Sequence, residues 1–294
     1  MTGYIGRFAP SPTGPLHFGS LLTALASFLD ARANNGIWRV RMEDLDPPRE
    51  QEGAAKVILD SLLAHGLVWD GDVLFQSTRL DAYKNTVQAL LDNGLAYACT
   101  CSRLQLKQHA IYNGACRNKR LPLNRKSAAR IKCGPEIISF NDGIQGLQSN
   151  QMDTELGDFV IFRKDGYTAY QLAVALDDDF QKISHVVRGS DLLDSTTRQL
   201  FILKRLGLST PEYCHLPVVV NQDGQKLSKQ TCAPAINPDR NSENLYHALI
   251  ELGQNPDPGL ARMPVQKIIN WAISHWSLDK VPKKLTITGK APHL

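Results

Sequence analysis

Residues 6–20 of the chain run Gly6-Arg7-Phe8-Ala9-Pro10-Ser11-Pro12-Thr13-Gly14-Pro15-Leu16-His17-Phe18-Gly19-Ser20. The apolar start, Tyr4–Phe8, predicts a short strand, and leucines at helical spacing predict a helix from His17 to about Asn34. A strand, a Pro/Gly-rich loop and a helix N-terminus together form a common phosphate site, because free N–H groups and the helix dipole face the anion. The alternative is a proline-rich turn with a helix-capping histidine, since the stretch has no Walker lysine and no dinucleotide glycine spacing.

Strand and helix patterns alternate on both sides of this stretch. The expected strands are Ile37–Met42, Asp158–Arg163, Ile183–Val187 and Pro217–Asn221, and the expected helices are Glu52–His65, Arg79–Asn93, Tyr170–Phe180 and Ser190–Leu206. Such alternation is typical of an α/β protein with a parallel sheet covered by helices. The pattern stops between Cys99 and about Gln151, where we expect loops, and the tail from Pro282 is expected to be frayed.

These breaks predict four parts. They are 1–98, the first half of a Rossmann-type catalytic domain; 99–157, an insertion; 158–235, the second half of that domain; and 236–294, a short helical C-terminal segment with amphipathic helices near 243–252 and 264–277.

Composition restricts the class of protein. The 294 residues carry a net charge of +4, which is compatible with a polyanionic partner. The chain starts with no signal-peptide pattern and has no apolar run of membrane-spanning length, so we expect a cytoplasmic protein without a membrane partner. The six cysteines should then be thiols or metal ligands, and we expect a monomer.

A second candidate phosphate segment, Lys226-Leu227-Ser228-Lys229-Gln230, follows an apolar strand and a tight turn. Two lysines flanking a serine suit a clamp on a triphosphate, because cations there stabilise charge that develops in the transition state. An exposed lysine pair is the simpler interpretation of this pentapeptide alone. The presence of the first segment in the same chain favours the interpretation as a phosphate clamp.

Together the two segments resemble the signature motifs of class I aminoacyl-tRNA synthetases: His17-Phe18-Gly19-Ser20 stands for His-Ile-Gly-His, and Lys226–Gln230 for Lys-Met-Ser-Lys-Ser. Gly6–Gly14, Arg39–Asp46, Trp69-Asp70 and Gln76-Ser77 are similar to glutamyl-tRNA synthetases. The short segment after the second motif, with Cys99-Thr100-Cys101 and Tyr112–Cys116, is typical of the glutamyl-Q tRNA(Asp) synthetases.

That resemblance implies a ligase activity. Such enzymes activate L-glutamate with ATP and Mg²⁺ without tRNA, then transfer it to queuosine, the modified wobble base of tRNA(Asp). The implied catalytic residues are His17, Lys226 and Lys229; ATP binding is assigned to His17, Gly19, Ser20, Lys226, Leu227, Ser228 and Lys229. Glutamate binding is assigned to Arg7, Phe8, Ala9, Pro10, Ser11, Glu43, Tyr170 and Arg188. There are also structural alternatives. Arg7, Glu43 and Arg188 could form salt bridges instead, and Tyr170 could be a core aromatic.

The insertion carries a candidate zinc site. Cys99, Cys101 and Cys116 supply three thiolates, and Zn²⁺ takes four tetrahedral ligands. From the residues alone His109 could be the fourth ligand, whereas the family pattern implies Tyr112. Three unrelated cysteines are the remaining interpretation. The insertion also holds nine basic residues between Arg103 and Lys132, which suit either a solvated face or an RNA contact.

Three other functions remain open at this point. A truncated glutamyl-tRNA synthetase would charge a tRNA 3′ end, and the missing anticodon-reading length argues against it. A non-catalytic RNA-binding paralogue is disfavoured by the intact His17, Lys226 and Lys229. Another nucleotidyl transferase, such as a pantothenate-type synthetase, does not explain the glutamyl-type flanks.

Overall fold

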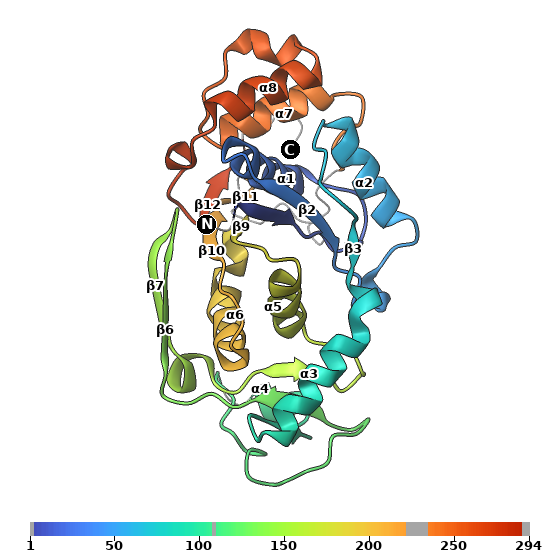
Figure 1. Cartoon of the computed structure of the whole chain (residues 1–294), viewed down its shortest axis with the longest axis vertical. Helices are drawn as coiled ribbons and strands as arrows, with labels where there is room; N and C mark the ends of the chain where they lie inside the picture. The colour runs from blue at the N-terminus through green and yellow to red at the C-terminus, as the bar shows by residue number, and fades with distance from the viewer. Residues whose placement is uncertain (1–2, 108–109, 222–234, 290–294) are drawn as a thin grey trace.

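A computed structural model describes residues 3–107, 110–221 and 235–289 (Figure 1). Its centre is a parallel sheet of β1 (Ile5–Phe8), β2 (Ile37–Met42) and β3 (Leu74–Phe75). A second parallel pair is β9 (His185–Gly189) with β10 (Glu212–Leu216). The Ser184 backbone N–H donates to the Ile5 carbonyl at 2.9 Å, which places β9 beside β1. The predicted α/β fold with parallel strands is confirmed.

Helix α1 (Phe18–Ala33) packs directly on β1, β2 and β9. The other helices of this part of the chain are α2 (Ala54–Ala64), α3 (Leu80–Asp92), α5 (Tyr170–Phe180) and α6 (Leu193–Leu206). Helix α1 is the most buried, because Leu21, Leu25 and Leu29 are fully enclosed in the main core. The residue before it, His17, caps the helix: its Nδ1 accepts a hydrogen bond from the Ser20 backbone N–H at 3.2 Å. This cap aims the N-terminus of α1 at the loop that follows β1.

The insertion is more regular than its sequence predicts. Strands β4 (Ala96–Cys99), β5 (Ala128–Ile131) and β8 (Val160–Phe162) form an antiparallel sheet, with α4 (Arg103–Lys107) beyond β4. Strands β6 (Ile137–Asp142) and β7 (Gly146–Gln151) form a hairpin. The expectation of loops was wrong here, because β4 and β5 are buried on both faces and show no polar alternation. The expected boundary at 98/99 lies within β4, and the one at 157/158 lies just before β8, which pairs with β5 of the same sheet.

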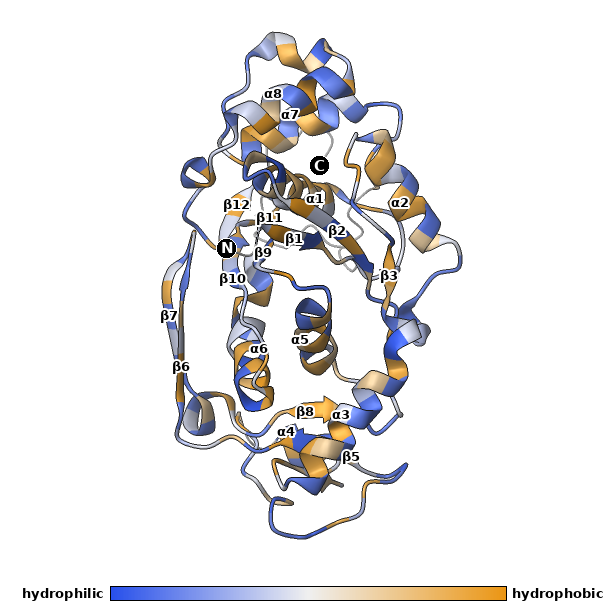
Figure 2. Cartoon of the chain, in the orientation of Figure 1, coloured by the Kyte–Doolittle hydropathy of each residue, from blue (hydrophilic) through white to orange (hydrophobic). Residues whose placement is uncertain are grey.

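The C-terminal helices lie at the opposite end of the molecule from this antiparallel sheet (Figure 1). Helices α7 (Asn241–Glu251) and α8 (Val265–His275) pack on α1, and Leu245, Leu249 and Ile269 join its core. Both helices carry polar and apolar residues along their length, as amphipathic helices do (Figure 2). The expected frayed tail was wrong in part, because β12 (Thr286–Thr288) pairs in parallel with β11 (Val218–Val220). Among the described residues, no helix has both the length and the apolar character required to span a membrane.

Candidate functional site

A cavity of about 440 Å³ opens where the loop after β1, the N-terminus of α1 and the ends of β9 and β11 meet. Its walls include every described residue that the sequence assigned to ATP or glutamate: Arg7, Phe8, Ala9, Pro10, Ser11, His17, Gly19, Ser20, Glu43, Tyr170 and Arg188. Ligands of open parallel sheets bind at the carboxyl ends of the strands, and Phe8 and Gly189 mark two such ends.

The second phosphate segment lies outside the described residues. Lys226, Leu227, Ser228, Lys229 and Gln230 therefore have no structural account here. Both described flanks of that segment reach the cavity. Val218 and Val219 of β11 line it, and on the other flank Ala235 forms a β-bridge with His17. The Ile236 backbone N–H donates to the Leu16 carbonyl at 3.1 Å.

Charged groups are concentrated on the cavity side of β1, β2 and α5. Asp178 Oδ1 accepts from Arg7 Nε at 3.3 Å and from Arg41 Nη1 at 2.7 Å. Arg41 Nη2 lies 3.4 Å from Glu43 Oε1. Burial alone would raise the pKa of Asp178, but the Arg41 and Arg7 guanidinium groups hold that pKa below its usual range. The contact to Asp178 fixes the Arg7 side chain at the wall. Both Arg7 Nη groups are without a hydrogen-bond partner among the described residues.

Glu43 and Tyr170 both line the cavity, and the Glu43 carboxylate acts on the Tyr170 hydroxyl. Burial raises the pKa of Glu43, and Arg41 and Arg7 oppose that rise. Burial, and then the Glu43 charge, raise the pKa of Tyr170. Tyr170 is 36% exposed at the first turn of α5 and lines the cavity, so it is not the core aromatic of the structural alternative.

Arg188 presents a second cationic group from β9. Its Nε donates to His215 Nε2 at 3.1 Å, and its Nη2 donates to Thr196 Oγ1 at 2.7 Å. Its Nη1 is buried and has no hydrogen-bond partner among the described residues. A guanidinium held on two sides with one free donor group can receive a carboxylate from the cavity.

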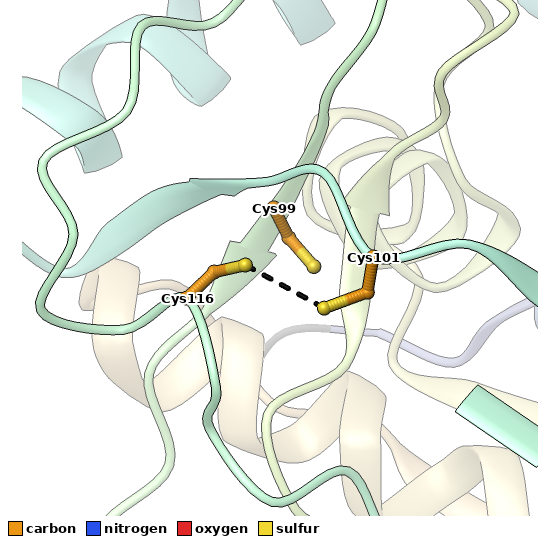
Figure 3. A group of neighbouring side chains, drawn as sticks. All are labelled: Cys99, Cys101 and Cys116. Atoms are coloured by element: carbon orange, nitrogen blue, oxygen red, sulfur yellow. Dashed lines mark hydrogen bonds between the residues drawn. The ribbon is translucent and has the colours of Figure 1, made fainter. Parts of the chain in front are cut away.

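The three cysteines of the insertion converge on one point (Figure 3). All three sulfur atoms lie within 4.8 Å of one another, and Cys101 Sγ is 3.5 Å from Cys116 Sγ. The Tyr112 hydroxyl lies 3.4 Å from Cys99 Sγ and 3.7 Å from Cys101 Sγ. His109 lies outside the described residues. Ligands on a tetrahedral zinc ion with Zn–S bonds of about 2.3 Å are roughly 3.8 Å apart, so this cluster could hold Zn²⁺.

The electrostatics of the cluster also suit a cation. Burial opposes ionisation of Cys116, yet hydrogen bonds from the Thr100 backbone and the Tyr112 hydroxyl lower its pKa to about 6. Burial and the neighbouring thiols raise the pKa of Cys101. Three thiols this close ionise together only when a metal ion compensates their charge.

Two basic residues of the insertion, Arg130 and Arg117, contact residues close to this cluster. Arg130 is buried, and its guanidinium lies 4.0 Å from the centre of the Tyr112 ring. Arg117 pairs with Asp158. The Arg130 side chain is therefore committed to packing, whereas Arg117 forms an ion pair and stays partly exposed.

Comparison with known proteins agrees with this geometry. Residues 5–253 match the family described as tRNA synthetases class I (E and Q), catalytic domain. The glutamyl-Q tRNA(Asp) synthetase of Neisseria meningitidis is 48% identical, over 97% of this chain and 99% of that protein. The enzyme of the same name from Pseudomonas fluorescens is 49% identical, over 97% of this chain and 96% of that protein.

The chain belongs to the glutamyl-Q tRNA(Asp) synthetase family. It is thus an aminoacyl-tRNA synthetase-like ligase. A crystal structure of a glutamate tRNA ligase from Elizabethkingia meningosepticum, in complex with its amino acid, superposes with a TM-score of 0.81 at 26% identity, over 99% of this chain and 68% of that one.

Several residues that carry the family resemblance form hydrogen bonds near the ends of strands. Asp44 accepts from the Ser77 backbone N–H at 2.9 Å, and Asp70 accepts from the Trp38 backbone N–H at 2.7 Å. Gln76 donates to the buried carboxylate of Asp177 at 2.7 Å. In this member of the family, these flanks hold the sheet under the cavity.

The residues that support the cavity from behind were not assigned a role from the sequence. Arg41 lies in the family-like stretch Arg39–Asp46, and Asp178 is one of three consecutive aspartates at the end of α5. The Asp142-Gly143 pair is a hairpin-turn signal that would have located Asp142 at the end of β6. His215 has no comparable signal.

Proposed function

We propose that the cavity binds L-glutamate and ATP and forms glutamyl-adenylate without tRNA. The observation that carries this proposal is the meeting of two cationic side chains, Arg7 and Arg188, with the carboxylate of Glu43 beside the N-terminus of α1. Each guanidinium can receive one carboxylate of glutamate, and Glu43 can accept from its α-ammonium group.

The two guanidinium groups of the cavity wall favour glutamate over glutamine. Arg7 and Arg188 both line the cavity, so one can receive the α-carboxylate of glutamate and the other its γ-carboxylate. Glutamine has a neutral amide in place of the γ-carboxylate and would form one charge-assisted pair fewer.

ATP is proposed to lie with its phosphates at the N-terminus of α1. Gly19 exposes backbone there, and His17 stands at the first turn. Lys226 and Lys229 are proposed to approach the phosphates because both flanks of their segment reach the cavity. Mg²⁺ enters as part of the MgATP substrate.

The first chemical step needs positioning and charge stabilisation. An oxygen of the glutamate α-carboxylate attacks the α-phosphorus in line, forming a P–O bond while the bond to the bridging oxygen breaks and pyrophosphate leaves. Donors from His17 and Lys229 stabilise the phosphoryl oxygens in the transition state. No group of the protein becomes acylated.

The second step is proposed to deliver glutamate to the queuosine base at the wobble position of tRNA(Asp). A hydroxyl oxygen of the cyclopentene-diol attacks the activated carbonyl carbon, AMP leaves, and the hydroxyl proton passes to solvent. The names of the relatives support this acceptor. The cluster of Cys99, Cys101, Tyr112 and Cys116 is proposed to hold a structural Zn²⁺ that braces the insertion.

The test supplies radiolabelled glutamate and ATP with tRNA(Asp) that carries or lacks queuosine. Label should enter only the queuosine-containing tRNA, and removal of the 3′-terminal adenosine should leave the labelling unchanged. Label that requires the terminal adenosine would support the alternative, a synthetase that charges a 3′ end. A chain that neither exchanges pyrophosphate nor labels RNA would support a non-catalytic RNA-binding paralogue.

A further inference from the structure

A buried chain of polar contacts runs from the β6–β7 hairpin to the cavity. His215 of β10 is completely buried, and its Nδ1 lies 2.6 Å from Asp142 Oδ2. On its other side, His215 Nε2 accepts from Arg188 Nε at 3.1 Å and lies 3.0 Å from Thr196 Oγ1. Arg188 lines the cavity. Contacts between β6, β10 and β9, which are distant in sequence, therefore link Asp142 through His215 to the Arg188 guanidinium.

The contacts fix the tautomer of His215. Because Nε2 accepts from an arginine that is always charged, the ring proton stands on Nδ1 and is donated to Asp142. Asp142 is held in turn, since its Oδ1 accepts from the backbone N–H groups of Ile144 at 3.0 Å and Gln145 at 2.9 Å. The arrangement specifies both the plane and the rotation of the imidazole.

Arg188 is oriented by this ring. With Nε bound to His215 and Nη2 bound to Thr196, the guanidinium plane is set by two contacts on different elements, β10 and α6. The remaining group, Nη1, is buried without a partner among the described residues. A buried cationic donor left unpaired is costly, so the geometry indicates that a ligand completes it.

We propose that His215 is a positioning residue for the amino-acid substrate: held by Asp142, it aligns Arg188 so that Nη1 receives a carboxylate of glutamate. This inference deepens the proposed function and rests on it. The pair also ties the hairpin of the insertion to the amino-acid site, so the alignment of Arg188 depends on the seating of β6 and β7.

The test measures glutamate-dependent ATP–pyrophosphate exchange in the full chain, with separate KM values for glutamate and ATP. His215→Leu removes the ring's contacts to Asp142, Arg188 and Thr196 and should raise the glutamate KM about tenfold or more, the effect of one lost charge-assisted hydrogen bond, while the ATP KM stays within about twofold. His215→Gln should lie closer to the parent, because its side-chain oxygen can still accept from Arg188.

Asp142→Asn is the sharper variant because it can keep the fold. Its amide oxygen can still accept from the Ile144 and Gln145 backbone groups. Its amide nitrogen would donate to His215 Nδ1, which moves the ring proton to Nε2 and sets two donors against each other at Arg188. The glutamate KM should rise as it does in His215→Leu, with a smaller loss of thermal stability.

His65 provides a matched control. It is also buried, and its Nδ1 lies 2.7 Å from the Ser61 carbonyl, away from the cavity. His65→Leu should leave both KM values unchanged. An unchanged glutamate KM in His215→Leu and Asp142→Asn would overturn the inference, as would an equal rise in His65→Leu. A parent chain without glutamate-dependent exchange would instead overturn the proposed function itself.

Discussion

The Oγ atom of Ser20 lies 2.9 Å from Nε2 of His17 at the first turn of α1. Because His17 Nδ1 accepts from the Ser20 backbone N–H, the ring proton stands on Nε2 and the Ser20 hydroxyl receives it. Ser20 stands where the class I signature has a second histidine. The serine therefore holds the catalytic candidate His17 in place between substrates, and a phosphoryl oxygen would compete for the same proton.

Replacement of these two residues should separate their roles. His17→Ala removes the donor to the phosphoryl group and should lower the exchange rate by about 10²–10³-fold, or roughly 3–4 kcal/mol. Ser20→Ala removes only the hydroxyl that accepts from His17 Nε2 and keeps the imidazole, so it should cost less than about tenfold. Exchange rates at saturating ATP measure both. Equal losses in the two variants would show that Ser20 itself contacts the nucleotide.

Lys229→Ala should lower the exchange rate by about 10²–10³-fold, because a cation near the leaving pyrophosphate is lost. The glutamate KM should change little, since Lys229 is assigned to ATP. Lys284, exposed in the C-terminal segment, offers a matched control, and Lys284→Ala should leave the rate unchanged. Exchange at the parent rate in Lys229→Ala would remove this residue from the mechanism.

The sequence predicts the sheet around the cavity well. β2 and α5 have the predicted bounds, because apolar alternation and helix periodicity are strong in both. The sequence also predicts that the cavity residues lie together. Several of them lie at or just after the ends of parallel strands, and a parallel sheet brings those ends to one edge.

The insertion and the support of the cavity were harder to predict. β4 and β5 have all four residues buried, so they lack the alternation that indicates a strand. The fixing of Arg188 by His215 depends on contacts between residues 27 positions apart. Contacts of this kind follow from tertiary packing, which the local pattern of one sequence does not contain.

The cysteine cluster predicts a specific pattern of metal loss. Cys116→Ser should reduce bound zinc from about one ion per chain to near none, since a structural site needs four ligands. Tyr112→Phe removes a hydroxyl that lies 3.4 Å from Cys99 Sγ and should weaken zinc retention against a chelator. Cys133→Ser is the matched control, because Cys133 is buried but its Sγ lies 3.2 Å from the Gly157 carbonyl instead. Metal analysis after dialysis measures all three, and full zinc content in Cys116→Ser would contradict the assignment.

Glu43 should govern the acidic limb of glutamate activation. Burial raises the pKa of its carboxyl above the ordinary value. As the pH falls through that raised pKa, Glu43 gains a proton and loses the charge that attracts the α-ammonium group. The kcat/KM for glutamate should therefore fall at a pH above the usual glutamate range of about 4.3. Glutamate-dependent ATP–pyrophosphate exchange, measured from pH 5 to 9 at saturating ATP, would show this decline of kcat/KM at acidic pH.

Glu43→Gln separates this limb from the titration of ATP and His17. The variant should have a kcat/KM reduced by about 10²-fold and should lose the Glu43 limb, while the limbs of other groups remain. Stability should respond in the opposite sense. A raised folded-state pKa gives a stabilising contribution that is present below the unfolded pKa and is lost as the pH rises through the folded one. The unfolding temperature of Glu43→Gln, relative to the parent, should thus be more favourable at pH 8 than at pH 4. A parent and variant with the same acidic limb would assign that limb to another group.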